Sequence, residues 1–264
     1  MLELINVSKT FNTGTINEKK ALCSVDLHLK PGDFVTVIGS NGAGKSTMLN
    51  AVAGVWPVDT GSIIIDGVNV TGQPEHKRAA YIGRVFQDPM LGTAPDMQIE
   101  ENLALAMRRG KKRGLRWEIS NEERRQYKEQ LSSFGLGLED RLTAKVGLLS
   151  GGQRQALTLL MATLQKPKLL LLDEHTAALD PATAAKVLEL SDRLIEENGL
   201  TAMMITHNMT DAIKHGTRLI MMHEGRIILD VSGEDKAKLT KRDLMDKFTE
   251  LAGSQIESDE ILLS

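Results

Sequence analysis

The chain has 264 residues, with 32 Lys and Arg against 35 Asp and Glu, a net charge of −3 and a single cysteine, Cys23. This composition excludes collagen-like, disulfide-rich and strongly disordered proteins. Only 3% of the residues are aromatic, so nothing favours a nucleic-acid-binding protein that works by base stacking and phosphate attraction. The sequence has no secretory signal pattern and no run near the ~18 apolar residues of a membrane span. These features predict one large cytosolic domain.

The first half of the chain predicts strands, then a loop and a helix. Alternating apolar and polar residues at 2–7 and 21–29 indicate half-buried antiparallel strands, joined by a polar loop. The continuous apolar run 34–38 predicts a buried strand, and a glycine-rich turn separates it from a helix at 46–53. Two shorter apolar runs are also expected to be strands, at 63–65 and 81–86.

The second half returns to buried strands after a polar insertion. Helix formers dominate residues 99–134, which predicts a helical subdomain inserted at about residues 90–160. Apolar strands are expected at 168–173 and 202–206, with a helix at 181–197 between them. The pattern predicts a single α/β domain over residues 1–250, with a mostly parallel sheet. Residues 251–264 are expected to form a poorly packed tail.

The strongest functional signal is the G-x-x-x-x-G-K-[ST] motif between a predicted strand and a predicted helix. Its residues are Gly39, Ser40, Asn41, Gly42, Ala43, Gly44, Lys45, Ser46 and Thr47. Backbone N–H groups of such a loop turn toward phosphate oxygens, and the following helix adds its N-terminal donors. Lys45 is predicted to reach the β- and γ-phosphates, and Ser46 to bind Mg²⁺. A glycine-rich turn that binds nothing is the alternative, and the strand–loop–helix context argues against it.

Two further motifs support phosphate chemistry. The apolar strand at 168–173 ends in Asp173, and Glu174 follows it. Beside a phosphate loop, the first carboxylate can hold Mg²⁺ and the second can orient and deprotonate an attacking water. Residues 149–153 read Leu-Ser-Gly-Gly-Gln, and Ser150 with Gln153 predicts a capping box at a helix start. That helix N-terminus is also an anion site that can meet a γ-phosphate brought by a second molecule.

These motifs resemble those of the ATP-binding-cassette (ABC) ATPases, the nucleotide-binding subunits of ABC transporters. The other motifs of that family follow in its order, at Phe11, Gln87, Ala178-Leu179-Asp180 and His207. The resemblance implies a P-loop NTPase fold of ABC type, with a mostly parallel sheet core, an N-terminal antiparallel β subdomain and an inserted α-helical subdomain. It also implies that the protein binds ATP and Mg²⁺ and hydrolyses ATP.

The resemblance implies a role for each matching residue. Phe11 would stack on adenine, and residues 39–47 would bind the phosphates. Glu174, His207, Gln87 and Lys45 would be catalytic. The metal ligands would be Ser46, Gln87 and Asp173. Four residues would contact nucleotide from the second copy, namely Ser150, Gly151, Gly152 and Gln153.

The resemblance also implies partners. Two copies would close head to tail on two ATP molecules and drive a separate transmembrane permease, on the inner face of the cell membrane. The amino-acid sequence of residues 135–164 and 173–180 resembles that of cassettes from the putative tryptophan/tyrosine and branched-chain amino-acid uptake group. This implies import of a small solute such as an amino acid, with an extracytoplasmic solute-binding protein as a further partner and no nucleic acid. Export of a lipid, peptide or drug stays open. A non-transport ABC ATPase acting on DNA or ribosomes is disfavoured, because the chain has one cassette and no coiled-coil insertion.

Two features depart from the family pattern or fall outside it. His175 stands where many members have proline, and we interpret it as a tolerated exchange, with electrostatic tuning of Glu174 as the alternative. A basic run is predicted to form a solvated face or to lie near anionic lipid headgroups. Its members are Arg108, Arg109, Lys111, Lys112, Arg113 and Arg116.

Overall fold

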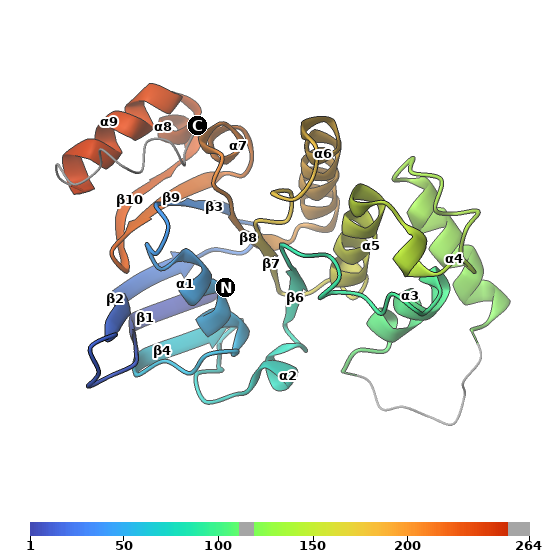
Figure 1. Ribbon diagram of the computed structural model, residues 1–264, viewed down its shortest axis with the longest axis horizontal. Coiled ribbons are helices and arrows are strands. Elements are labelled where there is room, and N and C mark those ends of the chain that lie inside the picture. Colours follow the sequence, from blue (N-terminus) through green and yellow to red (C-terminus); the bar gives the residue numbers. More distant parts are fainter. Residues whose placement is uncertain (111–118, 253–264) are drawn as a thin grey trace.

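The computed structural model describes residues 1–110 and 119–252, and their strands form two sheets (Figure 1). The first sheet has four strands in the order β2-β1-β4-β5, and its neighbours pair antiparallel. Its strands are β1 (Leu2–Phe11), β2 (Lys19–Leu29), β4 (Thr60–Ile65) and β5 (Val68–Asn69). The predicted N-terminal antiparallel β subdomain is therefore confirmed.

The second sheet has six strands in the order β10-β9-β3-β8-β7-β6. All its neighbours pair parallel except β10 and β9, which are antiparallel. The strands are β3 (Phe34–Ile38), β6 (Ile82–Val85), β7 (Leu169–Asp173), β8 (Thr201–Ile205), β9 (Arg218–His223) and β10 (Arg226–Ser232). The mostly parallel core sheet is also confirmed.

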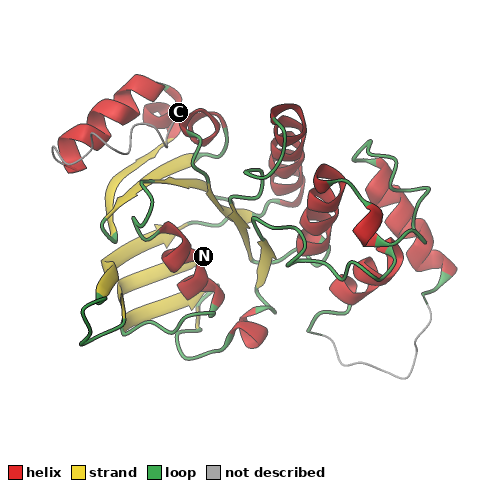
Figure 2. Cartoon of the chain, in the orientation of Figure 1, coloured by secondary structure: helices red, strands yellow, loops and turns green. Residues whose placement is uncertain are grey.

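Helices cover both faces of the core sheet (Figure 2). They are α1 (Lys45–Ala53), α2 (Glu75–Arg78), α3 (Ile99–Met107), α4 (Asn121–Ser132), α5 (Gly151–Thr163), α6 (Pro181–Asn198), α7 (Met209–Lys214), α8 (Gly233–Ala237) and α9 (Lys241–Ala252), with a 3-10 turn at Val146–Leu148. None of the helices in residues 1–110 and 119–252 is both long and apolar enough to cross a bilayer. Residues 253–264 of the predicted tail lie outside the described chain.

The core follows from the two-residue period of strand β7. Leu169 and Leu171 belong to the apolar cluster that packs α1 between the two sheets, whereas Leu170 and Leu172 pack against α5 and α6. All four side chains are fully buried. A strand covered on both faces reads as a continuous apolar run, which is why residues 169–172 show no alternation.

The helical subdomain consists of α3, α4 and one face of α5, and it extends to one side of the molecule (Figure 1). Helix α5 joins it to the core through two faces. Ala156 and Leu159 pack toward the core sheet, whereas Leu157 and Leu160 pack with α3 and α4. Helix α5 is therefore packed between the two parts of the protein.

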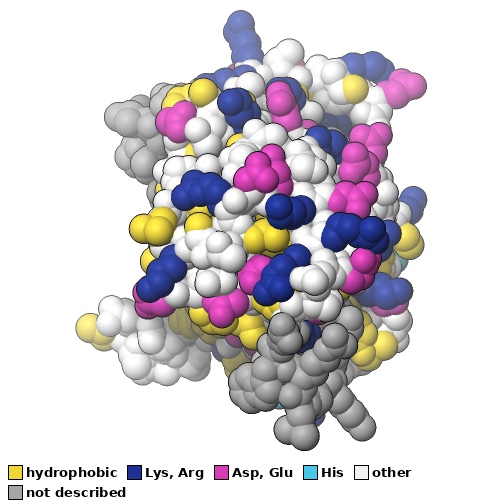
Figure 3. Space-filling model, turned by 90° about the vertical axis from the view of Figure 1, so that its right-hand side faces the viewer, with side chains coloured by type: hydrophobic (Ala, Val, Ile, Leu, Met, Phe, Trp, Pro, Cys, Tyr) yellow, Lys and Arg dark blue, Asp and Glu magenta, His cyan; other side chains and the backbone are white. Residues whose placement is uncertain are grey.

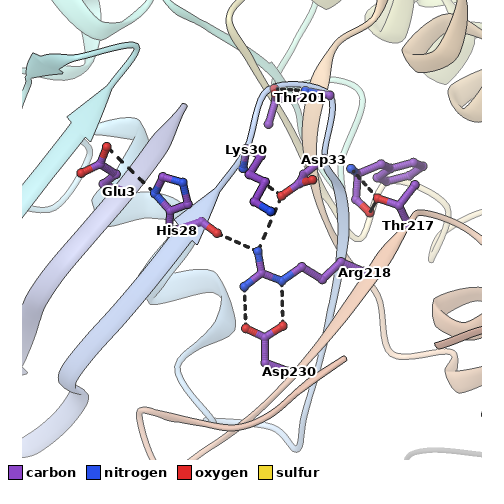
Figure 4. Close-up of polar contacts among 10 residues, drawn as sticks. Glu3, His28, Lys30, Asp33, Thr201, Thr217, Arg218 and Asp230 are labelled. Atoms are coloured by element: carbon purple, nitrogen blue, oxygen red, sulfur yellow. Dashed lines mark hydrogen bonds and ion pairs between the residues drawn. The ribbon is translucent and has the colours of Figure 1, made fainter. Parts of the chain in front are cut away.

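A polar network ties the two sheets together at the end of β2 (Figure 4). Arg218 of β9 makes two hydrogen bonds to Asp230 of β10, at 2.7 and 2.5 Å, and a third to the backbone carbonyl of His28 in β2 at 2.6 Å. Asp33 lies 3.6 Å from the same guanidinium. These contacts join β2, β9 and β10, and so link the edges of the two sheets.

Candidate functional site

The phosphate loop leaves strand β3 in a conformation that glycine alone tolerates. Gly39 has φ +147° and Gly44 has φ +103°. A Cβ atom at Gly39 would lie 2.2 Å from the Met222 carbonyl oxygen, and one at Gly44 would lie 2.5 Å from that of Ala21. The backbone of both sheets therefore approaches the loop too closely for any side chain at these positions.

Lys45, the first residue of α1, folds back under the loop. Its Nζ donates hydrogen bonds to the carbonyls of Gly39 at 2.6 Å and Ser40 at 3.0 Å, and the side chain is buried. Burial lowers the pKa of Lys45, whereas the nearby carboxylates of Glu174 and Asp173 raise it. The structure thus places the predicted lysine beside both predicted carboxylates.

Glu174 and His207 meet at the carboxyl ends of neighbouring parallel strands. The His207 Nε2 atom lies 2.5 Å from Glu174 Oε1. This hydrogen bond is the largest of the effects that hold the pKa of Glu174 below its ordinary value. Glu174 also has φ +46°, a left-handed backbone that is rare for a residue with a side chain. Sequence reasoning predicted the two residues separately but not their contact.

Asp173 lies at the end of β7 beside an arginine that the sequence did not single out. Arg84 Nη2 lies 3.4 Å from Asp173 Oδ2 and donates to Asn50 Oδ1 of α1 at 2.7 Å. Burial raises the pKa of Asp173, and the positive charge of Arg84 opposes that rise. Arg84 also lies over the ring of Phe86, with its guanidinium carbon 4.5 Å from the centroid.

The phosphate loop, Glu174 and His207 line an open cleft of about 450 Å³, whereas the predicted site residues Gly39, Ser40 and Asp173 are not part of its lining. Phe11 at the end of β1 and Gln87 after β6 both line it, and the Phe11 ring packs edge-on against Trp56, with 5.0 Å between centroids. The sequence missed Lys19 and Ala21 of β2, which line the cleft as well. The lining residues are Phe11, Lys19, Ala21, Asn41, Gly42, Ala43, Gly44, Lys45, Ser46, Thr47, Gln87, Glu174 and His207.

The predicted signature residues lie elsewhere. Ser150 caps α5, and its Oγ accepts a hydrogen bond from the backbone N–H of Gln153, whose Oε1 accepts from the backbone N–H of Ser150. The predicted capping box is therefore confirmed. Ser150, Gly152 and Gln153 line a second cleft with residues of α6, and the structure does not bring them to the phosphate loop of the same chain.

His175 has a different environment from Glu174. It is 2% exposed, and its Nε2 lies 3.0 Å from Ser191 Oγ of helix α6. Burial lowers the pKa of His175 to about 4, with a further lowering by His215 and an opposing effect of Asp192. A neutral imidazole in the core is a poor electrostatic partner for a carboxylate, so this environment argues against tuning of Glu174 by charge.

The basic run is only partly described. Arg108 forms an ion pair with Glu123 at 3.3 Å, and Arg109 is partly buried. The remaining members, from Lys111 to Arg116, lie outside the described residues. On the face of the molecule seen in Figure 3, basic and acidic side chains are interspersed. The described part of that face therefore carries both signs of charge.

Comparisons with known proteins agree with this geometry. Residues 22–177 match the family model of the ABC transporter. The chain is 43% identical over 252 residues to a tyrosine transport ATP-binding protein of Clostridioides difficile, covering 94% of this chain and 98% of that one. It is 34% identical over 244 residues to the spermidine/putrescine import ATP-binding protein PotA of Haemophilus influenzae, covering 90% of this chain and 61% of that longer relative.

Solved structures of cassettes have the same fold. A dimeric ATP-binding cassette in a post-hydrolysis state, bound to ADP and Pi, superposes with a TM-score of 0.74 at 32% identity, covering 88% of this chain and 98% of the other. A nucleotide-free ATP-binding cassette gives 0.76 at 25% identity, covering 97% and 99%. The chain belongs to the ABC transporter family, as an ATP-binding subunit that hydrolyses ATP.

Proposed function

We propose that this ATPase powers a separate transmembrane permease that imports a small solute, most simply an aromatic amino acid such as tyrosine. The observation that carries the proposal is the cleft in which the phosphate loop, Lys45 and the Glu174–His207 pair meet. The identity to a tyrosine transport ATP-binding protein supports the choice of solute. The permease and any solute-binding protein would select the solute, because fold and ATP site are common to cassettes with different solutes.

In this proposal the phosphate loop and Lys45 bind the triphosphate. The loop N–H groups and the N-terminus of α1 face the cleft and favour anions. Two of the three ammonium protons of Lys45 bind loop carbonyls, so the third is left to donate to the β- and γ-phosphates. Phe11 would stack on adenine at the mouth of the cleft, where Trp56 supports its ring.

Glu174 is the proposed base for the attacking water. Its lowered pKa keeps it a carboxylate at neutral pH, so it can orient the water and accept its proton. Lys45 and His207 would offset the charge that develops on the transferring phosphoryl group. In this structure His207 Nε2 hydrogen-bonds to Glu174. This bond would have to break before Nε2 could contact the γ-phosphate of a bound nucleotide.

Ser46 and Gln87 line the cleft, and Asp173 directly precedes the lining residue Glu174; together they offer the oxygen ligands that Mg²⁺ prefers. The Ser46 hydroxyl, the Gln87 amide oxygen and the Asp173 carboxylate are the groups that would hold the ion. The raised pKa of buried Asp173 reflects an unfavourable environment for its negative charge, and a cation would relieve that cost. When bound, the ion would neutralise charge on the phosphates.

A second copy of the chain would complete each site. Ser150 and Gly152 lie at the start of α5 and line a cleft separate from the phosphate loop. A helix N-terminus with its donors near solvent is suited to a γ-phosphate held by another molecule. We therefore propose a head-to-tail dimer with two shared ATP sites.

The permease would dock on the groove between the core and the helical subdomain. This groove has a volume of about 540 Å³ and includes Phe86, the neighbour of Gln87. Leu91 and Leu105 line it and are 71% and 44% exposed. Arg109 also lines the groove, and its buried Nε has no hydrogen-bond partner within the described residues. The protein would then be peripheral on the inner face of the cell membrane.

Reconstitution with a candidate permease tests the proposal. Proteoliposomes that contain the permease and this protein, loaded with ATP on the cassette side, should take up labelled tyrosine. The same vesicles with the Glu174→Gln variant should not. ATP-dependent extrusion of a lipid, peptide or drug without tyrosine uptake would favour the exporter alternative, and association with ribosomes or DNA in place of a permease would refute transport.

A further inference from the structure

The residue after Glu174 is a buried histidine that the proposed chemistry does not use. The Oγ of Ser191 donates a hydrogen bond to the Val187 carbonyl at 2.8 Å. Because a serine hydroxyl has a single proton and Ser191 donates it to Val187, we assign His175 as the donor to Ser191. Across their 3.0 Å contact, this assignment places the proton of the neutral imidazole on Nε2. Both side chains are almost completely buried, so this bond does not compete with water.

This hydrogen bond starts one residue from a strained peptide. Glu174 has a left-handed backbone, its N–H donates to the Ile205 carbonyl at 3.1 Å, and its carbonyl accepts from the Ala177 N–H at 3.0 Å. Such a conformation persists only where the surroundings hold it. The His175 side chain is a third attachment, and it ties the turn to helix α6.

The same helix also contacts the end of α7. His215 directly follows α7, the helix that begins two residues after His207, and its Nδ1 lies 2.6 Å from Asp192 Oδ2. Ser191 and Asp192 are adjacent on α6. Helix α6 therefore holds the residue after Glu174 through Ser191 and the C-terminal end of α7 through Asp192.

We propose that His175 is a positioning residue for ATP hydrolysis: through its hydrogen bond to Ser191 it holds the turn that aims the Glu174 carboxylate. The inference rests on the proposed function, because it assumes that Glu174 activates the attacking water. It gives His175 a specific role where proline is common in the family, in place of the tolerated exchange expected from sequence. A histidine that only fills the core would affect stability but leave the turnover of each folded molecule unchanged.

The test compares three variants and a control for ATPase kcat, KM for ATP and binding of a fluorescent ATP analogue. Ser191→Ala removes the acceptor, His175→Leu removes the donor, and His175→Gln keeps an N–H at a similar position. The control is Thr163→Val, because the Thr163 hydroxyl is buried and bonds back to its own helix at the Leu159 carbonyl, as Ser191 does at Val187. Rates are expressed per molecule that binds the analogue, so loss of folded protein does not count as loss of turnover.

We expect Ser191→Ala and His175→Leu to lower kcat about tenfold, with KM and analogue affinity changed less than about twofold. His175→Gln should recover most of the turnover, and Thr163→Val should match the parent. If Ser191→Ala and His175→Leu keep the parental kcat while Glu174→Gln is inactive, the positioning role is wrong and the proposed function stands. If Glu174→Gln itself hydrolyses ATP, the proposed function fails with it.

Discussion

Acidification should destabilise this protein in part because His175 is buried in its neutral form. The ordinary histidine pKa of 6.5 applies to the unfolded chain, whereas the folded value is about 4. Between these values the unfolded state binds more protons, so stability contributed by the neutral form is present above pH 6.5 and is lost as the pH falls toward 4. From about pH 7.5 to about pH 5, the loss due to this one residue is about 2 kcal/mol.

Urea denaturation of the parent and of His175→Gln at both pH values measures this loss. Glutamine does not titrate and keeps a donor for Ser191, and the other titrating groups are common to both proteins and cancel in the comparison. The parent should therefore lose about 2 kcal/mol more than the variant on acidification. Equal losses in the two proteins would show that His175 is not held neutral by burial, and the protonation state assigned from Ser191 would be wrong.

Three further substitutions test packing and nucleotide contacts. Gly152→Ala would place a Cβ 2.2 Å from the Thr183 methyl carbon, so the substitution should cost about 2 kcal/mol of stability in urea denaturation. Adding Thr183→Ser, which removes that methyl group, should restore most of the lost stability; if it does not, the clash is refuted. Arg78 is 2% exposed and donates hydrogen bonds to four backbone carbonyls. Arg78→Met should therefore lower the stability by about 3 kcal/mol in the same assay. An unchanged denaturation midpoint would contradict a stabilising role of these hydrogen bonds. Phe11→Ala should weaken binding of a fluorescent ATP analogue about tenfold while Phe11→Trp preserves it; equal affinities would argue against adenine stacking.

The parts of the fold that local pattern controls were predictable. The apolar run at 34–38, the glycine loop and the helix after it coincide with β3, the phosphate loop and α1. The capping box at Ser150 also appears as expected, because a capping box depends on residues three positions apart. The sequence did not predict β9, β10 or the C-terminal helices, which bear no recognised motif.

The contacts that complete the site were not predictable, because they join distant parts of the chain. Arg84 reaches Asp173 across 89 positions, and Lys19 enters the cleft from a segment expected to be a polar loop. No local pattern marks either residue. The role of His175 was equally hidden, since burial against α6 depends on how the helix packs on the sheet and not on the residues beside Glu174.

The role of Glu174 as the base is decided by the ATPase turnover of Glu174→Gln, measured beside its affinity for ATP. The variant should bind ATP about as tightly as the parent, accumulate as a dimer with ATP, and turn over at least about a hundredfold more slowly, since the amide cannot accept the proton of the attacking water. Turnover close to that of the parent, with ATP binding intact, would contradict the assignment of Glu174 as the base.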